Sequence, residues 1–277
     1  IGILLCLVGG SVLNIGLNMQ KKAYLNMDKL AAEKKNLPLG NMVWLTGFVV
    51  FILGNVANFT ALQFAPQSLV APLGAISLVT NVIVAPWLNG ERLSRWDIGG
   101  IVLIIGGCVI AVVFSGVVSI DYRLCVLINL LKATATVVYL CIIGSCVIAI
   151  WLIRFALPLA YASLGGLMAT LTTLFAKSLI NLLAVSITQG KNQFTSFLAW
   201  VILIVTVTTA VSQVFWINMG LRRYDALLQV PVFYVVWTVF DIIGGGIYYD
   251  EFAGFTATKA VVFSLGVLII FAGVGIL

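Results

Sequence analysis

Asp241 is the only acidic residue deep inside a long apolar stretch of this chain, the one covering residues 226–249. If that stretch lies in hydrocarbon, an ionised carboxylate is costly unless it is paired, hydrated or protonated, so such residues tend to face a cavity. Carboxylate oxygens also bind hard divalent cations. Asp241 is therefore the first candidate for a cation-binding or proton-carrying residue. The alternative is a structural role, in which it pairs with Lys177 or hydrogen-bonds a neighbouring helix.

Asparagine side chains recur at helical spacing in two other apolar stretches. Ser11, Asn14 and Asn18 follow one another at i, i+3 and i+7, which places them on one helix face. Asn55 and Asn58 stand one turn apart. An amide has four hydrogen-bonding positions to satisfy, so asparagines in apolar helices need polar surroundings. Stripes that converge are what a water-filled pathway requires.

Two further stripes carry threonines together with a longer polar side chain. They comprise Thr170, Thr173 and Lys177, and Thr206, Thr209 and Gln213. Threonines often bond back to their own helix or join two helices, so packing is the alternative reading for them. Lys177 is interpreted either as a pathway residue or as a lysine near a helix end whose ammonium group reaches the surface.

The composition requires that lipid cover these stretches. Hydrophobic residues make up 62% of the chain and charged residues only 9%, against roughly 25% charged in ordinary soluble domains. Each apolar run has about the twenty residues that a membrane-spanning helix needs. The runs lack the alternation of barrel strands, so we expect an all-α polytopic membrane protein.

Several classes of function are disfavoured by what the chain lacks. It has no histidine, which is the usual transition-metal ligand and proton relay. Its five cysteines show no CxxC spacing, and most stand in apolar runs, where free thiols act as small hydrophobes. Without GxSxG, P-loop or paired intramembrane aspartates, we expect neither an enzyme nor a cofactor. The basic residues lie in loops, so we expect no nucleic-acid partner.

Nine transmembrane helices are predicted, and the segment Asp121–Lys132 suits a short amphipathic helix at the membrane interface. No basic segment precedes the first apolar run, so we expect a spanning helix there and not a cleaved signal peptide. The predicted spans are 1–19, 40–63, 67–89, 97–118, 134–156, 158–182, 194–220, 226–249 and 257–277.

Basic residues predict the orientation of these spans. The loops after spans one, three, five and seven hold ten of the 15 Lys and Arg residues. Since cytoplasmic loops are enriched in Lys and Arg, we expect an external N-terminus and a cytoplasmic C-terminus. The ten are Lys21, Lys22, Lys29, Lys34, Lys35, Arg92, Arg95, Arg154, Arg222 and Arg223.

The two halves of the chain match one another at nearly constant spacing. The matched anchors are Gly9-Gly10 with Gly165-Gly166, Lys21 with Lys177, Pro72 with Pro231, Gly90-Glu91 with Asp250-Glu251, and Gly106 with Gly266. We therefore predict a first four-helix repeat at 1–118, an interfacial segment and connector helix at 119–156, and a second repeat at 157–277. One connecting span inverts the second repeat relative to the first.

Inverted repeats are typical of secondary transporters, whose sites lie near the bilayer midplane where the repeats meet. The repeat spacing makes Asn81 the equivalent of Asp241, and we expect these two side chains to face each other. It also puts Glu91 in a cytoplasmic loop and Glu251 in an external loop. Pro72 and Pro231 are expected to kink their helices.

Several motifs resemble the NIPA-type magnesium transporters of the drug/metabolite transporter superfamily over nearly the whole chain. The resemblance is to a divergent member, because Asn55 stands where many of these proteins carry glutamate and Asp241 where they usually lack an acid. The segments that carry it are Gly54-Asn55-Val56-Ala57-Asn58-Phe59, Phe64-Ala65-Pro66-Gln67-Ser68-Leu69-Val70-Ala71-Pro72-Leu73-Gly74, Asn89-Gly90-Glu91-Arg92-Leu93, Phe175-Ala176-Lys177-Ser178-Leu179 and Pro231-Val232-Phe233-Tyr234 through Gly246-Ile247-Tyr248.

The resemblance implies a transporter or permeation pathway for divalent cations, Mg²⁺ first, in the plasma membrane or an endosomal or other endomembrane. Asp241 is the expected metal ligand. The other expected pathway residues are Asn81, Asn14, Asn18, Asn55, Asn58, Gln213 and Lys177. The alternatives are a proton-coupled or exchanging carrier of small metabolites with the same fold, and a non-transporting subunit of a membrane complex. The partners are a small solute and the lipid bilayer, and a homodimer stays open.

Overall fold

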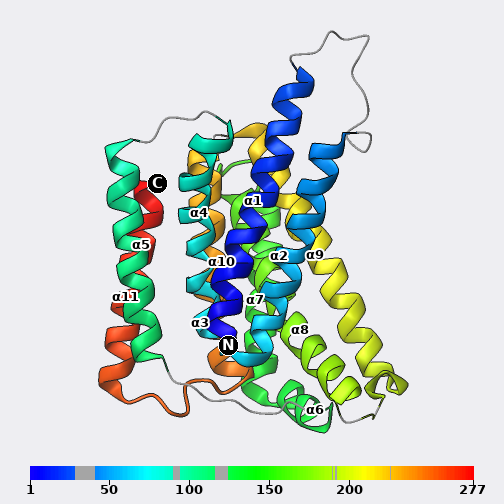
Figure 1. Cartoon of the computed structure of the whole chain (residues 1–277). Coiled ribbons are helices and arrows are strands. Elements are labelled where there is room, and N and C mark those ends of the chain that lie inside the picture. Colours follow the sequence, from blue (N-terminus) through cyan, green and yellow to red (C-terminus); the bar gives the residue numbers. More distant parts are fainter. Residues whose placement is uncertain (29–40, 90–93, 116–123, 189, 191, 225) are drawn as a thin grey trace. The chain divides into compact units, whose positions relative to one another are not determined.

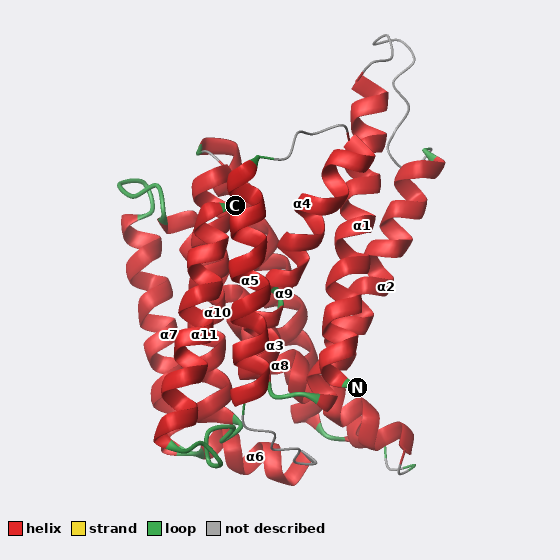
Figure 2. Cartoon of the chain, turned by 60° about the vertical axis from the view of Figure 1, so that its left-hand side comes forward, coloured by secondary structure: helices red, strands yellow, loops and turns green. Residues whose placement is uncertain are grey.

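The computed structural model covers residues 1–277 and describes all of them except 29–40, 90–93, 116–123, 189, 191 and 225. Every regular element among the described residues is a helix, and none is a strand (Figures 1 and 2). The helices are α1 (Gly2–Asp28), α2 (Met42–Phe64), α3 (Gln67–Leu73), α4 (Ala75–Asn89), α5 (Arg95–Phe114), α6 (Leu124–Lys132), α7 (Thr134–Ile153), α8 (Ala160–Thr188), the 3-10 helix η3 (Gln193–Thr195), α9 (Phe197–Arg223), α10 (Ala226–Tyr248) and α11 (Ala257–Ile276).

Nine helical segments within the described residues are long and apolar enough to cross a membrane. The predicted all-α membrane protein with nine spans is thereby confirmed. The predicted spans 134–156 and 226–249 agree closely with α7 and α10. Both α1 and α8 run past the predicted span ends, to Asp28 and Thr188. The extension of α1 is largely polar, whereas that of α8 is mostly apolar and belongs to the candidate span Ala160–Thr188. Glu91, Arg92 and the predicted segment start at 121–123 lie outside the described residues.

The predicted third span is divided at Gly74 into α3 and α4. Pro72 lies in the last turn of α3. Its ring clashes with the preceding turn, and its nitrogen has no hydrogen to donate, so proline disfavours a continuous helix at this position. Ser77 donates both its backbone N–H and its hydroxyl to the Gly74 carbonyl, at 3.0 and 2.7 Å, which starts α4. In contrast, Pro231 lies in the first turns of α10, which continues as one helix to Tyr248.

The chain forms two compact units, which are described one by one. Unit 1 comprises residues 1–64, 72–114 and 260–277, and so contains α1, α2, α4, α5 and most of α11. Unit 2 comprises residues 65–71 and 115–259, and so contains the start of α3 together with α6 to α10. Each unit is therefore built from segments that are not contiguous in the sequence.

Unit 1 contains two helix pairs that approach closely through glycines. On the first pair, a Cβ placed on Gly16 of α1 would lie 2.6 Å from the carbonyl oxygen of Gly47 on α2. On the second, a Cβ on Gly107 of α5 would lie 2.6 Å from the carbonyl oxygen of Gly266 on α11, which runs beside α5 in Figures 1 and 2. Small residues allow such approach in lipid, where packing drives helix association.

Unit 2 is built around α8, which packs against α7, α9 and α10. Its core includes Leu174 and Leu182 of α8 together with Tyr139 and Ile143 of α7. The short helix α6 confirms the predicted helical segment, and its Leu127 is fully buried in the same core. α6 directly precedes α7, and Figure 2 shows it lying across the end of unit 2 at which α7 begins. Its place at a membrane interface stays a prediction.

Candidate functional site

A cluster of buried charged and polar side chains lies within unit 2. Asp241 of α10 and Gln67 of α3 are 0% exposed, Glu251 of the loop after α10 is 1% exposed, and Lys177 of α8 is 4% exposed. Charged residues are almost never this buried unless they are paired. These four residues, which come from three helices and a loop, are called the charged cluster below.

Glu251 reaches the cluster because the chain turns back sharply after α10. Asp250 has a φ of 52°, in the left-handed region that aspartate tolerates better than most residues. The Glu251 backbone N–H then donates to the Gly245 carbonyl at 3.4 Å. A Cβ on Gly245 would lie 2.5 Å from Oε2 of Glu251 and 3.0 Å from the Ser68 nitrogen. Glycine at 245 therefore leaves the space that the carboxylate occupies.

Both oxygens of the Glu251 carboxylate are used. Oε1 accepts from the Gln67 backbone N–H at 2.7 Å and from the Lys177 ammonium at 2.5 Å, and Oε2 accepts from the Ser68 backbone N–H at 2.8 Å. The first N–H groups of a helix have no partner within it, so the carboxylate satisfies two of them at the start of α3. Lys177 also lies over the ring of Tyr249, 4.5 Å from its centroid.

The Asp241 carboxylate is hydrogen-bonded by the Gln67 side chain and not by Lys177. Its Oδ1 accepts from Nε2 of Gln67 at 2.7 Å. The Thr173 hydroxyl is also close enough to influence this carboxylate. However, that hydroxyl donates to the Ala169 carbonyl at 2.8 Å and accepts from the Trp237 indole at 3.0 Å. Its single proton is therefore not free for Asp241.

Three buried oxygens in this region have no hydrogen-bond partner among the described residues. They are Oδ2 of Asp241, Oε1 of Gln67 and Oγ1 of Thr238, which precedes Asp241 by three residues on α10. Buried polar atoms nearly always have a partner, and each exception costs about 1–3 kcal/mol. Unused oxygens beside a carboxylate suit a bound cation or water.

The charges of the cluster do not balance within the described part of unit 2. When ionised, Asp241 and Glu251 carry two negative charges against the single positive charge of Lys177, and Asp241 interacts electrostatically with both. Burying an unbalanced charge is strongly unfavourable. The described residues contain no group of three His, Cys, Asp or Glu side chains that could hold a metal ion. The donor set thus fits a cation that keeps part of its water shell, as Mg²⁺ typically does.

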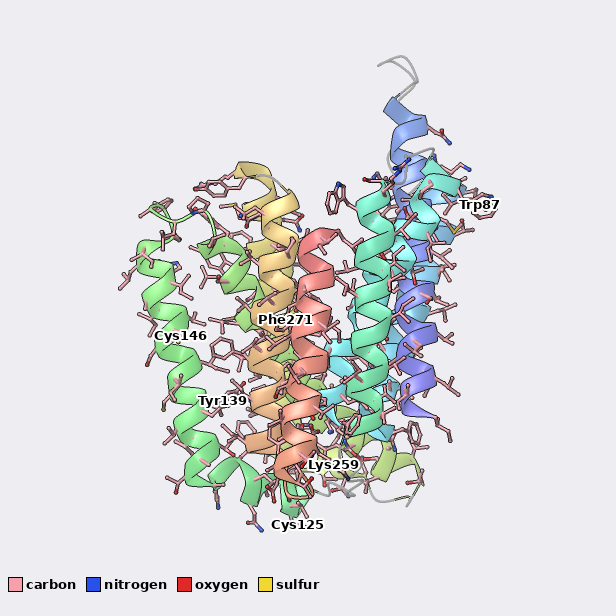
Figure 3. The ribbon with its side chains drawn as sticks, turned by 90° about the vertical axis from the view of Figure 1, so that its left-hand side faces the viewer. Trp87, Cys125, Tyr139, Cys146, Lys259 and Phe271 are labelled. Atoms are coloured by element: carbon pink, nitrogen blue, oxygen red, sulfur yellow. The ribbon has the colours of Figure 1, made fainter. Side chains whose placement is uncertain are left out.

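Tyr139 of α7 binds the backbone of α10 at Phe240, the residue before Asp241. The Tyr139 hydroxyl donates to the Phe240 carbonyl at 2.7 Å, and Figure 3 shows this side chain on α7 facing α10. Gly244 makes room for the hydroxyl, since a Cβ there would lie 2.6 Å from it. Two glycines of the triplet 244–246 therefore leave space for neighbouring side chains, Gly244 for Tyr139 and Gly245 for Glu251.

In unit 1, the structure brings Asn14, Asn18 and Asn81 together. Nδ2 of Asn18 on α1 donates to Oδ1 of Asn81 on α4 at 2.8 Å and to the Asn14 carbonyl at 3.0 Å. Asn14 donates to the Gly10 carbonyl at 3.3 Å. Asn14 and Asn18 are buried, whereas Asn81 is exposed. A polar line thus runs from α1 to α4.

The asparagines of α2 are both half-buried. Asn55 donates to the Phe51 carbonyl of its own helix at 2.9 Å. Oδ1 of Asn58 is buried without a partner among the described residues, and a Cβ on Gly9 of α1 would lie 2.8 Å from it. Asn58 therefore faces α1, while Asn55 is satisfied locally.

Threonines also join α8 to α9. The Thr172 hydroxyl of α8 donates to the Thr209 hydroxyl of α9 at 3.0 Å, and the Thr209 hydroxyl donates to the Val205 carbonyl of its own helix at 2.8 Å. Gln213 is half-buried one turn further along α9. The hydrogen bonds described above for the charged cluster do not include Gln213.

One of the two interpretations of Lys177 is wrong. Lys177 does not extend to the surface, because it lies well inside α8 and its ammonium group pairs with a buried carboxylate. Glu251 lies in the loop after α10, and its side chain is buried there because it binds Lys177 and two N–H groups of α3. The suggested pair of Asp241 with Lys177 is likewise replaced by the pair of Lys177 with Glu251.

Sequence reasoning missed Glu251, Gln67 and Thr238 as site residues. Glu251 was recognised only as a repeat anchor, and Gln67 only as part of the segment after Pro66. An acidic residue soon after the end of a spanning helix, five positions after a glycine triplet, is the feature that could have drawn attention to Glu251.

Nine apolar helices among the described residues, with a buried charged cluster, define an integral membrane protein of the polytopic α-helical class. A family model described as magnesium transporter NIPA matches residues 1–277. The chain is 30% identical to the probable magnesium transporter NIPA8 of Arabidopsis thaliana, over 100% of this chain and 68% of that protein. It is 28% and 26% identical to the NIPA-like protein 2 of Mus musculus and of Homo sapiens, in each case over 99% of this chain and 72% of the relative.

The chain belongs to the NIPA magnesium transporter family. No solved structure matches it.

Proposed function

We propose that this protein transports divalent cations across a membrane, with Mg²⁺ as its main substrate, and that Asp241 is the carboxylate that binds the cation. Membership of the family supports the substrate class. The observation that carries the assignment of Asp241 is its fully buried Oδ2, which has no partner among the described residues and lies in a cluster whose lysine already pairs with Glu251. A cation supplies the charge that the cluster lacks.

Gln67 and Thr238 are proposed to complete the protein's share of the ligands. Carbonyl and hydroxyl oxygens are ligands that hard cations accept, and Mg²⁺ keeps several waters beside them. The Gln67 amide presents Nε2 to Asp241 and leaves Oε1 free. Rotation of this amide would turn its oxygen toward a cation at Asp241, because the two ends of the group have nearly the same shape.

The remaining pathway is proposed to involve Asn14, Asn18, Asn81, Asn55, Asn58, Gln213 and Lys177. The contact of Asn18 with Asn81 and the free oxygen of Asn58 support a polar route along α1. The inverted repeats at 1–118 and 157–277, the external N-terminus, the cytoplasmic C-terminus and a plasma or endomembrane location belong to the same proposal. They rest on the matched anchors and on the distribution of basic loops.

Purified protein reconstituted in liposomes with an enclosed Mg²⁺-sensitive dye tests the function, and a panel of small metabolites tests the main alternative. We expect saturable Mg²⁺ uptake. Asp241→Asn should lower it on the order of tenfold or more, since loss of 1.4 kcal/mol in binding already corresponds to tenfold. The matched control is Asp250→Asn, which removes the same charge from an exposed neighbour whose left-handed φ suits asparagine.

Three results would contradict the proposal. Metabolite uptake without Mg²⁺ uptake by well-folded protein would favour the carrier of small molecules. Unchanged Mg²⁺ uptake by folded Asp241→Asn would show that the carboxylate is structural. Absence of any transport by folded protein would favour a subunit of a membrane complex.

A further inference from the structure

A second charged feature of unit 2 lies far from the charged cluster, at the ends of three candidate spans. The span of α7 ends at Ile153, that of α8 begins at Ala160, and that of α9 ends at Leu221. The loop after α7 lies at the end of unit 2 opposite α6 in Figure 2. Residues just beyond these limits stand where helices leave the hydrocarbon and meet the lipid headgroups.

Two arginines at this end share an aromatic ring. The Arg154 guanidinium lies 4.2 Å from the ring centroid of Trp151 and 4.3 Å from that of Phe155. The Arg223 guanidinium lies 5.7 Å from the Phe155 centroid and 5.2 Å from that of Tyr161. Arg223 also donates to the Tyr161 hydroxyl at 2.6 Å, and Arg154 donates to the Trp151 carbonyl. Loops after different spans thus bring two positive charges to one place.

Neither guanidinium forms an ion pair with a carboxylate of the described residues, among which Lys177 pairs with Glu251. Two like charges near one ring repel each other, so an anion that contacts both is favoured. The N-terminal end of α8, which starts at Ala160, adds the positive end of its helix dipole to the same region. The electrostatics therefore select an anion.

The surroundings of the two arginines match a lipid. Trp151 is 44% exposed and Phe155 is 67% exposed, and aromatic rings concentrate at the membrane interface. Leu152 and Ile153, next to Arg154 on its hydrocarbon side, are 65% and 46% exposed. A soluble anion would make no contact with these apolar surfaces, whereas the acyl chains of a lipid would cover them.

We propose that Arg154 and Arg223 form a binding site for the headgroup phosphate of an anionic phospholipid, with Trp151 and Phe155 against its glycerol and acyl region. Guanidinium groups bind phosphate through paired N–H donors, which gives geometry as well as charge. The site is independent of the transport proposal, because it lies at the other end of unit 2 from Glu251.

Native mass spectrometry of the full chain in detergent, titrated with phosphatidylglycerol or phosphatidylcholine, tests the site. We expect phosphatidylglycerol to bind with about fivefold higher affinity for each arginine that contacts it. Arg154→Gln with Arg223→Gln should reduce its binding to the level of phosphatidylcholine. The control pair Lys132→Gln with Lys259→Gln removes the same charge elsewhere in unit 2 and should keep the preference.

Three results would overturn the proposal. These are equal binding of the two lipids by the unaltered protein, unchanged phosphatidylglycerol binding by the double variant, and displacement of that lipid by inorganic phosphate at similar concentration, which would indicate a site for a soluble anion. Because Arg223 also bonds Tyr161, the double variant could fail to fold. Arg154→Gln alone then serves, with an expected loss of about fivefold.

Discussion

Lys177 and Glu251 form an ion pair of 2.5 Å across 74 residues of sequence, and their side chains are only 5% and 1% exposed. The pair joins the middle of α8 to the loop that follows α10. Because Glu251 also accepts from two backbone N–H groups of α3, one carboxylate connects three separate segments of unit 2. Loss of either partner would leave a charge buried without compensation, which is more damaging than loss of the whole pair.

The first prediction concerns this coupling. Lys177→Met or Glu251→Gln alone should destabilise the protein by about 3–5 kcal/mol, the range for breaking a buried pair. The double variant should be clearly more stable than the sum of the two losses implies, because it leaves neither member of the pair buried without the other. Denaturant unfolding in detergent micelles measures all four corners of the cycle. Strict additivity would show that the two side chains act independently.

The second prediction concerns the space left at Gly245. Gly245→Ala would place a Cβ 2.5 Å from Oε2 of Glu251, so either the carboxylate or the turn must shift. Overpacking of this kind costs about 1–3 kcal/mol. Gly106→Ala is the control, since a Cβ there has nothing within 4 Å and alanine favours a helix. A lower unfolding midpoint for Gly106→Ala than for Gly245→Ala would contradict this account.

Much of the fold follows from the sequence because lipid imposes a simple requirement. An apolar run of about twenty residues must be helical to satisfy its backbone, so the nine spans were predictable. The division of the third span at Gly74 was foreshadowed by Pro72 but not located by it. The largely polar residues that lead to Asp28 extend α1 beyond its apolar run, and hydropathy carries no information on that.

The site was less predictable, because long-range contacts determine it. The depth of Asp241 in an apolar run was visible in the sequence. The inward turn of Glu251 was not, since it depends on the left-handed Asp250, on the space at Gly245 and on the start of α3, which is more than 180 residues away. One interpretation of Lys177 placed its ammonium group at the surface, because its partner Glu251 could not be identified from the sequence.

The third prediction concerns Gln67, whose amide holds Asp241 at 2.7 Å. Gln67→Leu has a similar size but neither donates to the carboxylate nor offers an oxygen to a cation. The Mg²⁺ concentration for half-maximal uptake should rise on the order of tenfold, as for the loss of a hydrogen bond to a charged group. Gln63→Leu, at a half-buried position on α2, is the control. Unchanged Mg²⁺ dependence in folded Gln67→Leu would remove Gln67 from the proposed ligand set.

The last prediction is topological. Glu251 is buried and unsuitable for labelling, but Ala253 two residues later is exposed, as is Ser94 before α5. Five candidate spans separate Ser94 from Ala253, beginning with Arg95–Phe114 and ending with Leu228–Tyr248. An odd number of crossings puts the two positions on opposite sides of the membrane. The basic loops further predict that Ser94 is cytoplasmic.

Ser94→Cys and Ala253→Cys, each in a background without the five native cysteines, allow a test with a membrane-impermeant thiol reagent. In intact cells, the reagent added outside should label Ala253→Cys and not Ser94→Cys, and permeabilisation should make both reactive. The cysteine-free protein without either substitution is the control for background labelling. If the two positions react from the same side, one of the five segments does not cross. The second four-helix repeat would then not be inverted relative to the first, and the transport pathway proposed between the repeats would lose its basis.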